Sequence, residues 1–248
     1  MVGPASRERR VSIHLVGGGR DEDHGTDVYR AFVAESAARA AALDRVVPRI
    51  GVLIVTAEDG AEALPFVELL RRTASCDPVA TIVSEGDRFD STVLGDIDGL
   101  VIGGGHTPSY LEAVSRITGE IRLLVADGLP YLGFSAGAAI AADRAIVGGW
   151  LVGDIPVCPE DAAEDLDEVT IAEGLGLVDL AIDVHCAQWG TLGRLVAATE
   201  AGLVDGGVGI DEHTALIVGE GRLEVVGAGS VWRVAAHEEG VLVGALGA

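Results

Sequence analysis

The 248-residue sequence contains no lysine, so arginine supplies all 17 of its basic side chains. Acidic side chains number 39, and the formal net charge at pH 7 is −22. A surface with this charge repels phosphate backbones and anionic lipids. The composition therefore argues against nucleic acids and membranes as partners.

Aromatic residues are also scarce, at 4%, whereas hydrophobic residues make up 49% of the chain. A core built mainly from Ala, Val, Leu and Ile suits a mostly parallel sheet covered by helices. No apolar run reaches the roughly 18 residues of a membrane-spanning helix. The apolar stretch Val11–Val16 is too short for the core of a secretory signal. We read it as a first strand and expect a cytoplasmic protein.

Cysteine is rare as well, and Cys76, Cys158 and Cys186 are too widely spaced for a disulfide framework or a zinc site. The run Gly17–Gly19 lacks the third glycine of a dinucleotide-binding motif. The acidic stretch 159–168, PEDAAEDLDE, lacks the glycine and ligand spacing of a calcium loop, so we interpret it as a solvated loop. We expect neither a metal nor a cofactor.

The first half of the sequence alternates strand and helix patterns. Short β-branched runs occur in VSIHLVGG, IGVLIV, VATIVS, GLVIGG and YLGF. Helical patterns over 29–43, 61–73 and 108–126 lie between several of them, with Thr107 placed to cap the last. This alternation predicts an α/β fold with a doubly wound, mostly parallel sheet, in which ligands bind at the carboxyl ends of the strands.

The second half predicts additional antiparallel strands. AIVGGWLVG is typical of a hairpin, LAIDVH of a strand and GTLGRLVAATEAG of a helix. GVGIDEHTALIV and RLEVVGAGSVWRV resemble antiparallel strands joined by a turn at 219–221. No linker, repeat or low-complexity tract interrupts the sequence, so we expect residues 1–248 to form a single domain.

The segment Gly133–Gly137 reads GFSAG and fits the G-x-S-x-G pattern of a nucleophile elbow. It follows an apolar strand and precedes a helical run, a context that favours a nucleophilic Ser135 over a serine that merely caps a helix. The backbone N–H of Ala136, at the start of that helix, is placed to stabilise an oxyanion. The run Gly103–Gly105 ends another strand, and it fits equally well a second donor to that oxyanion and a simple tight turn into the next helix.

A nucleophilic serine needs a histidine base and an orienting acid. His185 ends the strand-like LAIDVH, which would bring it to the sheet edge where Ser135 lies. Spacing alone leaves two arrangements open. One is His185 with Glu212, and the other is an order that ends at His213 or His237.

Four segments in order, VIGGGHTPSYLEAV, GFSAGAAIAA, DVHCAQWGTLGRL and GIDEHTALIV, resemble the serine-peptidase family of cyanophycinase and aspartyl dipeptidase. The last two are more similar to the cyanophycinase branch. The resemblance implies a fold like that of class I glutamine amidotransferases, a homodimer, and cleavage of a peptide or isopeptide bond without a cofactor. It implies a nucleophile, a base and an orienting acid at Ser135, His185 and Glu212. It also implies an oxyanion hole at Gly104, Gly105 and Ala136.

The same resemblance implies five substrate-binding residues: His106, Asp183, Trp189, Thr191 and Arg194. Cyanophycinases typically read G-G-D-Q where this chain has 103–106, and they carry further arginines around position 194 that this chain lacks. The planar guanidinium of an arginine binds a carboxylate through two parallel hydrogen bonds. The sequence therefore predicts poor cleavage of cyanophycin. It favours a substrate with an apolar or aromatic group and one anionic group for Arg194.

Two other functions share parts of these patterns. An esterase of the α/β-hydrolase type shares the elbow but needs a Ser-acid-His order ending at His213 or His237. A non-catalytic binding module would keep the fold and lose the activated serine.

Overall fold

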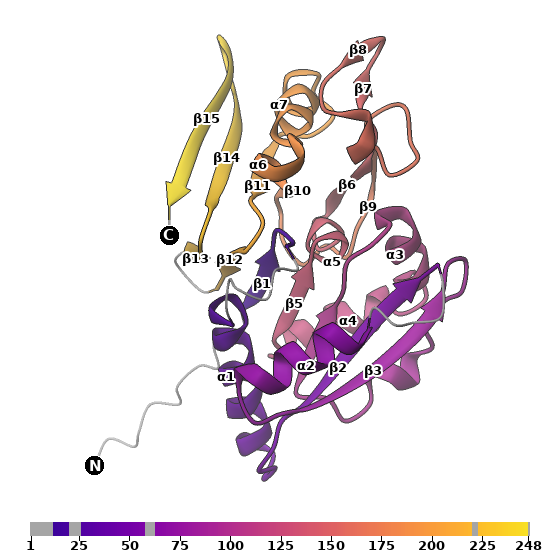
Figure 1. The fold of residues 1–248 in the computed structure, drawn as a ribbon, viewed down its shortest axis with the longest axis vertical. Helices are drawn as coiled ribbons and strands as arrows, with labels where there is room; N and C mark the ends of the chain where they lie inside the picture. The colour runs from indigo at the N-terminus through magenta and orange to yellow at the C-terminus, as the bar shows by residue number, and fades with distance from the viewer. Residues whose placement is uncertain (1–11, 20–25, 58–62, 220–222, 248) are drawn as a thin grey trace.

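The structure, a computed structural model, describes residues 12–19, 26–57, 63–219 and 223–247. A seven-stranded sheet runs through its centre in the order β13-β12-β1-β5-β4-β2-β3 (Figure 1). Its five neighbouring parallel strands are β1 (Ile13–Val16), β5 (Tyr131–Phe134), β4 (Gly99–Ile102), β2 (Arg49–Thr56) and β3 (Asp77–Ser84). Two antiparallel strands, β12 (Thr214–Val218) and β13 (Leu223–Gly227), extend it.

Helices cover both faces of this sheet, because its buried strands carry apolar side chains in both directions. On β2, Ile54 packs in a cluster with α1 and α2, whereas the next residue toward the N-terminus, Leu53, packs in a cluster with α3 and α4. The helices are α1 (Asp27–Ala42), α2 (Ala63–Thr73), α3 (Thr107–Val114) and α4 (Thr118–Ala126). The predicted mixed α/β fold with a mostly parallel central sheet is confirmed.

The single helix predicted over 108–126 is instead two helices. α3 ends at Val114 and α4 begins at Thr118, and the backbone of Ile117 between them is not helical (φ −114°, ψ 5°). Thr107 does not cap α3 but is its first residue, and its hydroxyl donates to Glu164. Ile117 itself is buried, so the break keeps the predicted apolar position in the core.

A second sheet has four strands in the order β10-β11-β14-β15. Its strands are β10 (Ala181–Val184), β11 (Gly206–Ile210), β14 (Ser230–His237) and β15 (Gly240–Gly247), and only β10 and β11 are parallel to each other. The chain passes between the sheets over 211–213 and again over 228–229. The predicted turn at 219–221 lies outside the described residues except for Gly219.

The hairpin predicted in AIVGGWLVG does not form between its two halves. β6 (Arg144–Gly148) pairs with β9 (Thr170–Glu173), and β7 (Leu151–Val152) pairs with β8 (Ile155–Pro156). Gly149 lies so close to the backbone of Glu168 that an added Cβ would overlap it. Trp150 and Leu151 donate their backbone N–H groups to Asp167 O, so the chain after β6 runs against the acidic stretch 159–168.

Several short elements complete the fold: the 3-10 helices η2 (Ser91–Leu94) and η3 (Glu160–Ala162), and the helices α5 (Ala136–Ala139), α6 (Cys186–Trp189) and α7 (Leu192–Glu200). One buried apolar cluster contains Leu53 of the central sheet and both Ile182 and Val208 of the second sheet, so the two sheets share a core. Within the described ranges, no helix combines the length and the apolar character needed to cross a membrane.

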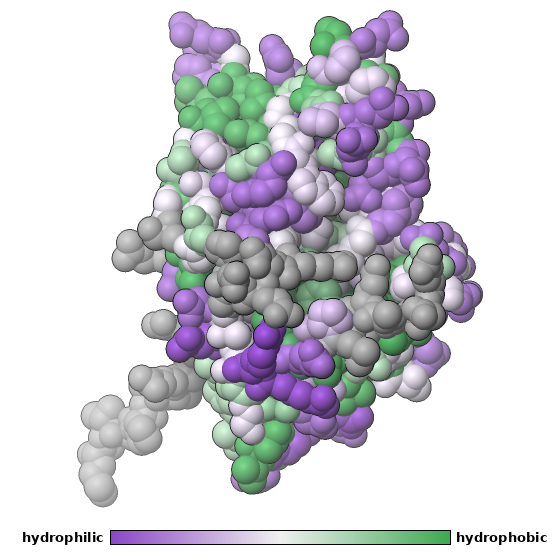
Figure 2. Space-filling view, in the orientation of Figure 1, coloured by the Kyte–Doolittle hydropathy of each residue, from purple (hydrophilic) through white to green (hydrophobic). Residues whose placement is uncertain are grey.

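The face shown in Figure 2 is mainly hydrophilic, with an apolar patch in the region of β14 and β15. Leu242 and Val243 of β15 are exposed, with 58% and 46% of their surface accessible.

Candidate active site

β5 leads directly into a sharp turn at Ser135. The backbone there has φ +51° and ψ −109°, a combination that residues with a side chain rarely adopt, and α5 begins at the next residue. Gly133 and Gly137 make the turn possible. A Cβ on Gly133 would overlap the backbone of Gly137, and one on Gly137 would overlap Ile102 O. The strand–turn–helix arrangement predicted from GFSAG is present.

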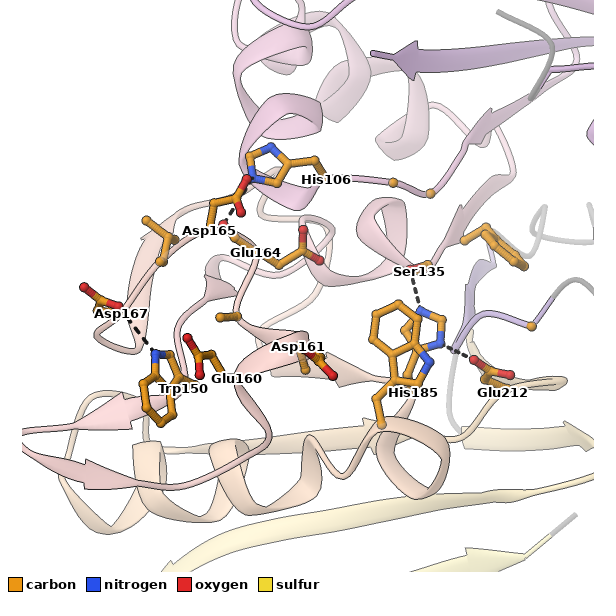
Figure 3. Close-up of a pocket in the computed structure, with 18 residues that line it drawn as sticks. His106, Ser135, Trp150, Glu160, Asp161, Glu164, Asp165, Asp167, His185 and Glu212 are labelled. Atoms are coloured by element: carbon orange, nitrogen blue, oxygen red, sulfur yellow. Dashed lines mark hydrogen bonds and ion pairs between the residues drawn. The ribbon is translucent and has the colours of Figure 1, made fainter. Parts of the chain in front are cut away.

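Three polar side chains form a hydrogen-bonded chain at this turn (Figure 3). Ser135 Oγ lies 2.8 Å from His185 Nε2, and His185 Nδ1 lies 2.6 Å from Glu212 Oε1. His185 follows β10 and Glu212 follows β11. Because β10 and β11 are parallel neighbours, their carboxyl ends meet at one edge and bring the two residues together. This is the first of the two arrangements that spacing left open.

The other two candidate histidines lie elsewhere. His213 donates its backbone N–H to Gly18 O, and its ring lies against Gly19. His237 ends β14, where its Nδ1 accepts a hydrogen bond from the backbone N–H of Glu239. The geometry at Ser135 therefore differs from the one that an order ending at His213 or His237 requires.

His185 is buried, with 6% of its surface exposed, and its ring stacks on that of Trp189. Burial lowers the pKa of His185 below its ordinary value, and the hydrogen bond and charge of Glu212 oppose that change. Glu212 accepts the hydrogen on Nδ1, so Nε2 of the neutral ring is the proton acceptor facing Ser135. The arrangement suits a general base at neutral pH.

Backbone N–H groups lie beside the serine. Gly104 packs so closely that an added Cβ would be 2.8 Å from Ser135 Cβ. Ala136 is the first residue of α5, so its N–H has no acceptor within the helix. Gly105 follows Gly104 along the pocket wall. Donors placed in this way can stabilise negative charge on a reacting carbonyl oxygen.

Asp183 and Arg194, which the sequence predicts at the substrate, instead face each other inside the protein. Arg194 is 5% exposed, and its Nε and Nη2 donate to the two Asp183 oxygens at 2.8 and 2.7 Å. Its Nη1 donates to the carbonyls of Gly149 and Ala162. Thr191 is also buried. The expectation that these residues contact a substrate is corrected, because all three are buried and both the guanidinium and the Thr191 hydroxyl donate to internal acceptors.

A pocket of about 870 Å³ opens in front of Ser135. His106 and Trp189 line it, as the sequence predicts. The acidic stretch that we interpreted as a solvated loop forms its opposite wall (Figure 3). The acidic residues of this wall are Glu160, Asp161, Glu164, Asp165 and Asp167. The stretch is therefore part of the site.

Comparison with known proteins identifies the family. Residues 69–226, more than half of the chain, match the model of peptidase family S51. The chain belongs to peptidase family S51. This membership makes the chain a peptidase and supports the serine type. The matched region includes the elbow, the acidic wall and positions 185 and 212.

Individual relatives agree with this S51 membership. A cyanophycinase of Trichormus variabilis is 28% identical over 236 residues, which cover 90% of this chain and 72% of the relative. A cyanophycinase of Synechococcus elongatus is 30% identical over 231 residues, with 88% and 66% covered. The crystal structure of a peptidase from an acI-B1 Actinobacterium is similar in fold, with a TM-score of 0.60 at 17% identity and 95% and 96% of the two chains covered.

Sequence reasoning missed the part that Gly17–Gly19 plays in this S51 site. Gly17 O accepts the backbone N–H of His185, and a Cβ on Gly18 would overlap the imidazole. The glycines thus let the chain after β1 run directly against the histidine. A glycine run at the end of a strand indicates either a close approach of two backbones or a phosphate site. The sequence therefore contained the pattern from which this contact could be predicted.

Sequence reasoning also missed Glu164, which attaches the acidic wall to α3. Its carboxylate accepts hydrogen bonds from the backbone N–H and the hydroxyl of Thr107, both at 3.0 Å. Its carbonyl oxygen lies 3.1 Å from His106 Nε2. Burial raises the pKa of Glu164, and the hydrogen bonds from Thr107 oppose that change. A carboxylate of the protein itself therefore occupies the amino end of α3.

No three His, Cys, Asp or Glu side chains in the described part of this S51 peptidase converge in a way that could hold a metal ion. The three cysteines are free, and Cys186 is buried. Burial raises the pKa of the Cys186 thiol well above its ordinary value, which keeps it protonated and unreactive.

Proposed function

We propose that this S51 peptidase hydrolyses a peptide or isopeptide bond in a small or peptidic substrate through an acyl-enzyme. Ser135 is the nucleophile, His185 the base and Glu212 the orienting acid. The observation that carries the proposal is the hydrogen-bonded chain from Ser135 Oγ through His185 to Glu212, at the wall of a pocket large enough for a substrate.

In the first half-reaction, Ser135 Oγ attacks the carbonyl carbon while His185 Nε2 takes the hydroxyl proton. The carbonyl oxygen becomes negatively charged next to the N–H groups of Gly104, Gly105 and Ala136. When this intermediate collapses, the C–N bond breaks and the leaving amine takes the proton from His185. The product is an ester on Ser135.

In the second half-reaction, a water molecule attacks the ester carbon and gives its proton to His185 Nε2. The ester C–O bond breaks, and Ser135 Oγ takes that proton back. The net products are one amine and one carboxylic acid. Glu212 keeps the imidazole in the tautomer that this cycle needs and stabilises the imidazolium formed in each step.

The neighbouring acid, Asp211, uses its carboxylate for hydrogen bonds within the protein, which supports Glu212 as the orienting acid. Asp211 is 5% exposed. Its two oxygens accept hydrogen bonds from the backbone N–H groups of Ala187 and Ser230 and from the indole of Trp232.

We also infer that cyanophycin is a poor substrate. The two relatives described above are named cyanophycinases, but the described pocket lining of this chain contains no arginine. The part of the sequence-based prediction that assigns an anionic substrate group to Arg194 is withdrawn, because that guanidinium is buried against Asp183. The class I glutamine amidotransferase-like fold also remains an inference, supported by a nucleophile that directly follows a central parallel strand.

A hydrolysis assay over a library of dipeptides and isopeptides, with simple esters beside them, tests the proposed function. We expect turnover of amide substrates by the wild type, none by Ser135→Ala and wild-type turnover by Ser115→Ala, an exposed serine directly after α3. Activity on esters alone would favour the esterase. Equal activity in Ser135→Ala would contradict the serine mechanism.

A further inference from the structure

The wall that faces Ser135 across the pocket is acidic. Glu160 and Asp161 are exposed and, within the described residues, have no salt-bridge partner. Asp167 lies next to Trp150, whose indole N–H points to its carboxylate at 3.5 Å. Figure 3 shows Glu160 and Asp167 across the pocket from Ser135, His185 and Glu212, with Asp161 between the two groups. A group bound between the two sides therefore lies in a negative potential.

Among the residues that the structure describes, the positive groups that could offset this potential are absent from the lining or bound to other partners. The chain has no lysine, and no arginine is among the described lining residues. Arg194, which the family resemblance implies at the substrate, has its guanidinium bound to Asp183 and two carbonyls. The amino end of α3, which would attract an anion, already holds the carboxylate of Glu164.

Two indole rings give a second, independent indication of a cationic ligand. Trp150 and Trp189 both line the pocket, and Trp189 is 46% exposed. The face of an indole attracts ammonium and guanidinium groups. Carboxylates combined with indole faces are a combination that binds organic cations, whereas solvated acids alone would not specify a ligand.

We propose that the pocket selects substrates with a positively charged group, an ammonium or a guanidinium, near the scissile bond, and rejects substrates with a carboxylate there. The acidic wall, residues 160–167, sets this preference. The proposal rests on the proposed function, since it places the selected group beside the bond that Ser135 attacks. It gives the pocket a charge preference opposite to the one predicted from Arg194.

Matched compounds test the charge preference directly. In one pair, an arginine residue is compared with citrulline, which has the same shape and no charge. In the other pair, a β-aspartyl-arginine unit whose α-carboxylate is free is compared with the same unit in which that carboxylate is converted to an amide. We expect kcat/KM to be about ten-fold higher for arginine than for citrulline, and higher for the amide than for the free acid. Both ratios should shrink as salt rises from 0.01 to 1 M, because exposed charges are screened.

Wall variants locate the preference. Glu160→Gln and Asp161→Asn should each lower the arginine-to-citrulline ratio about two- to five-fold, the range of exposed ion pairs. Asp154→Asn makes the same charge change at an exposed position outside the pocket lining, and should leave the ratio unchanged. Equal ratios in the wall variants and the wild type would overturn the assignment to residues 160–167.

A binding measurement separates this proposal from the proposed function. Calorimetric titration of the Ser135→Ala variant with the same four compounds needs no catalysis. Tighter binding of arginine than of citrulline supports the charge preference even if no compound is hydrolysed by the wild type. Turnover by the wild type combined with equal affinities and equal kcat/KM values overturns the charge preference and leaves the proposed function standing.

Discussion

The indole of Trp189 lies parallel to the imidazole of His185, with the ring centroids 3.9 Å apart and the planes at 8°. The two rings come from consecutive parts of the chain, since α6 begins directly after His185 and ends at Trp189. The short helix therefore holds one flat surface against the imidazole. In the proposed mechanism this surface limits the rotation of the ring and favours the imidazolium that each proton transfer creates.

Replacing Trp189 tests this stacking. We expect Trp189→Leu to lower kcat about two- to five-fold, which corresponds to the roughly 0.5–1 kcal/mol of an exposed cation–π contact. Trp189→Phe, which keeps an aromatic face, should retain most of the activity. Steady-state kinetics on one good substrate measures both variants. A leucine variant with wild-type kcat would show that the stacking has no part in turnover.

The pH dependence tests the state of His185. In the proposed mechanism the neutral imidazole is the base, so kcat/KM should fall as pH falls through the pKa of His185. Burial lowers that pKa, so the fall should lie below the ordinary histidine value of about 6.5. In Glu212→Gln, the partner that raises the pKa is lost. We expect the fall to move to still lower pH and kcat to drop by about two to four orders of magnitude.

Asp211→Asn is the matched control for Glu212→Gln. The Asp211→Asn variant should leave unchanged the pH at which kcat/KM falls, because Asp211 does not contact His185. It should lower the free energy of unfolding by about 1–3 kcal/mol, because Asp211 accepts three buried or half-buried hydrogen bonds. If Asp211→Asn shifted the pH profile and Glu212→Gln did not, the assignment of the acid would be reversed.

The buried pair of Asp183 and Arg194 predicts a stability effect rather than a specificity effect. Arg194→Leu leaves the Asp183 carboxylate buried without its partner, so the free energy of unfolding should fall by about 3–5 kcal/mol. The double variant Asp183→Leu, Arg194→Leu should recover part of that loss. Urea denaturation followed by circular dichroism measures both. A stable Arg194→Leu variant with reduced affinity for anionic substrates would restore the role in substrate binding.

Gly18 provides a test of the close approach to His185. Gly18→Ala should lower kcat about a hundred-fold, since the added methyl overlaps the imidazole and displacement by about 1 Å costs that much. Gly86→Ala is the control: Gly86 also has a positive φ (85°), but an added Cβ meets nothing within 4 Å. Only the first variant should lose activity at equal folded fraction, measured by kinetics beside near-ultraviolet circular dichroism.

Much of the fold and part of the candidate site could be predicted from the sequence. Strand and helix patterns indicated the central sheet, because parallel buried strands are continuous apolar runs such as IGVLIV. The G-x-S-x-G pattern indicated the turn at Ser135 because its glycines are needed for the close approach of β5 and α5. The cytoplasmic location and the homodimer stay predictions.

The remaining features depend on contacts between distant segments. Spacing could not select Glu212, because its position depends on the passage of the chain from β11 in one sheet to β12 in the other. The family resemblance placed Arg194 at the substrate, and a lone arginine in the sequence gives no sign that Asp183 lies opposite. The acidic stretch was interpreted as solvated because its return to the pocket depends on Glu164 reaching Thr107, 57 residues away.

Intact-mass measurement after reaction with a neutral fluorophosphonate shows whether Ser135 is an activated nucleophile, since only an activated serine forms the adduct. We expect one adduct on the wild type, located at Ser135, none on Ser135→Ala, a strongly slowed reaction on His185→Ala and a wild-type rate on His237→Ala. An unchanged rate on His185→Ala, or an adduct on Ser135→Ala, would contradict the proposed serine mechanism.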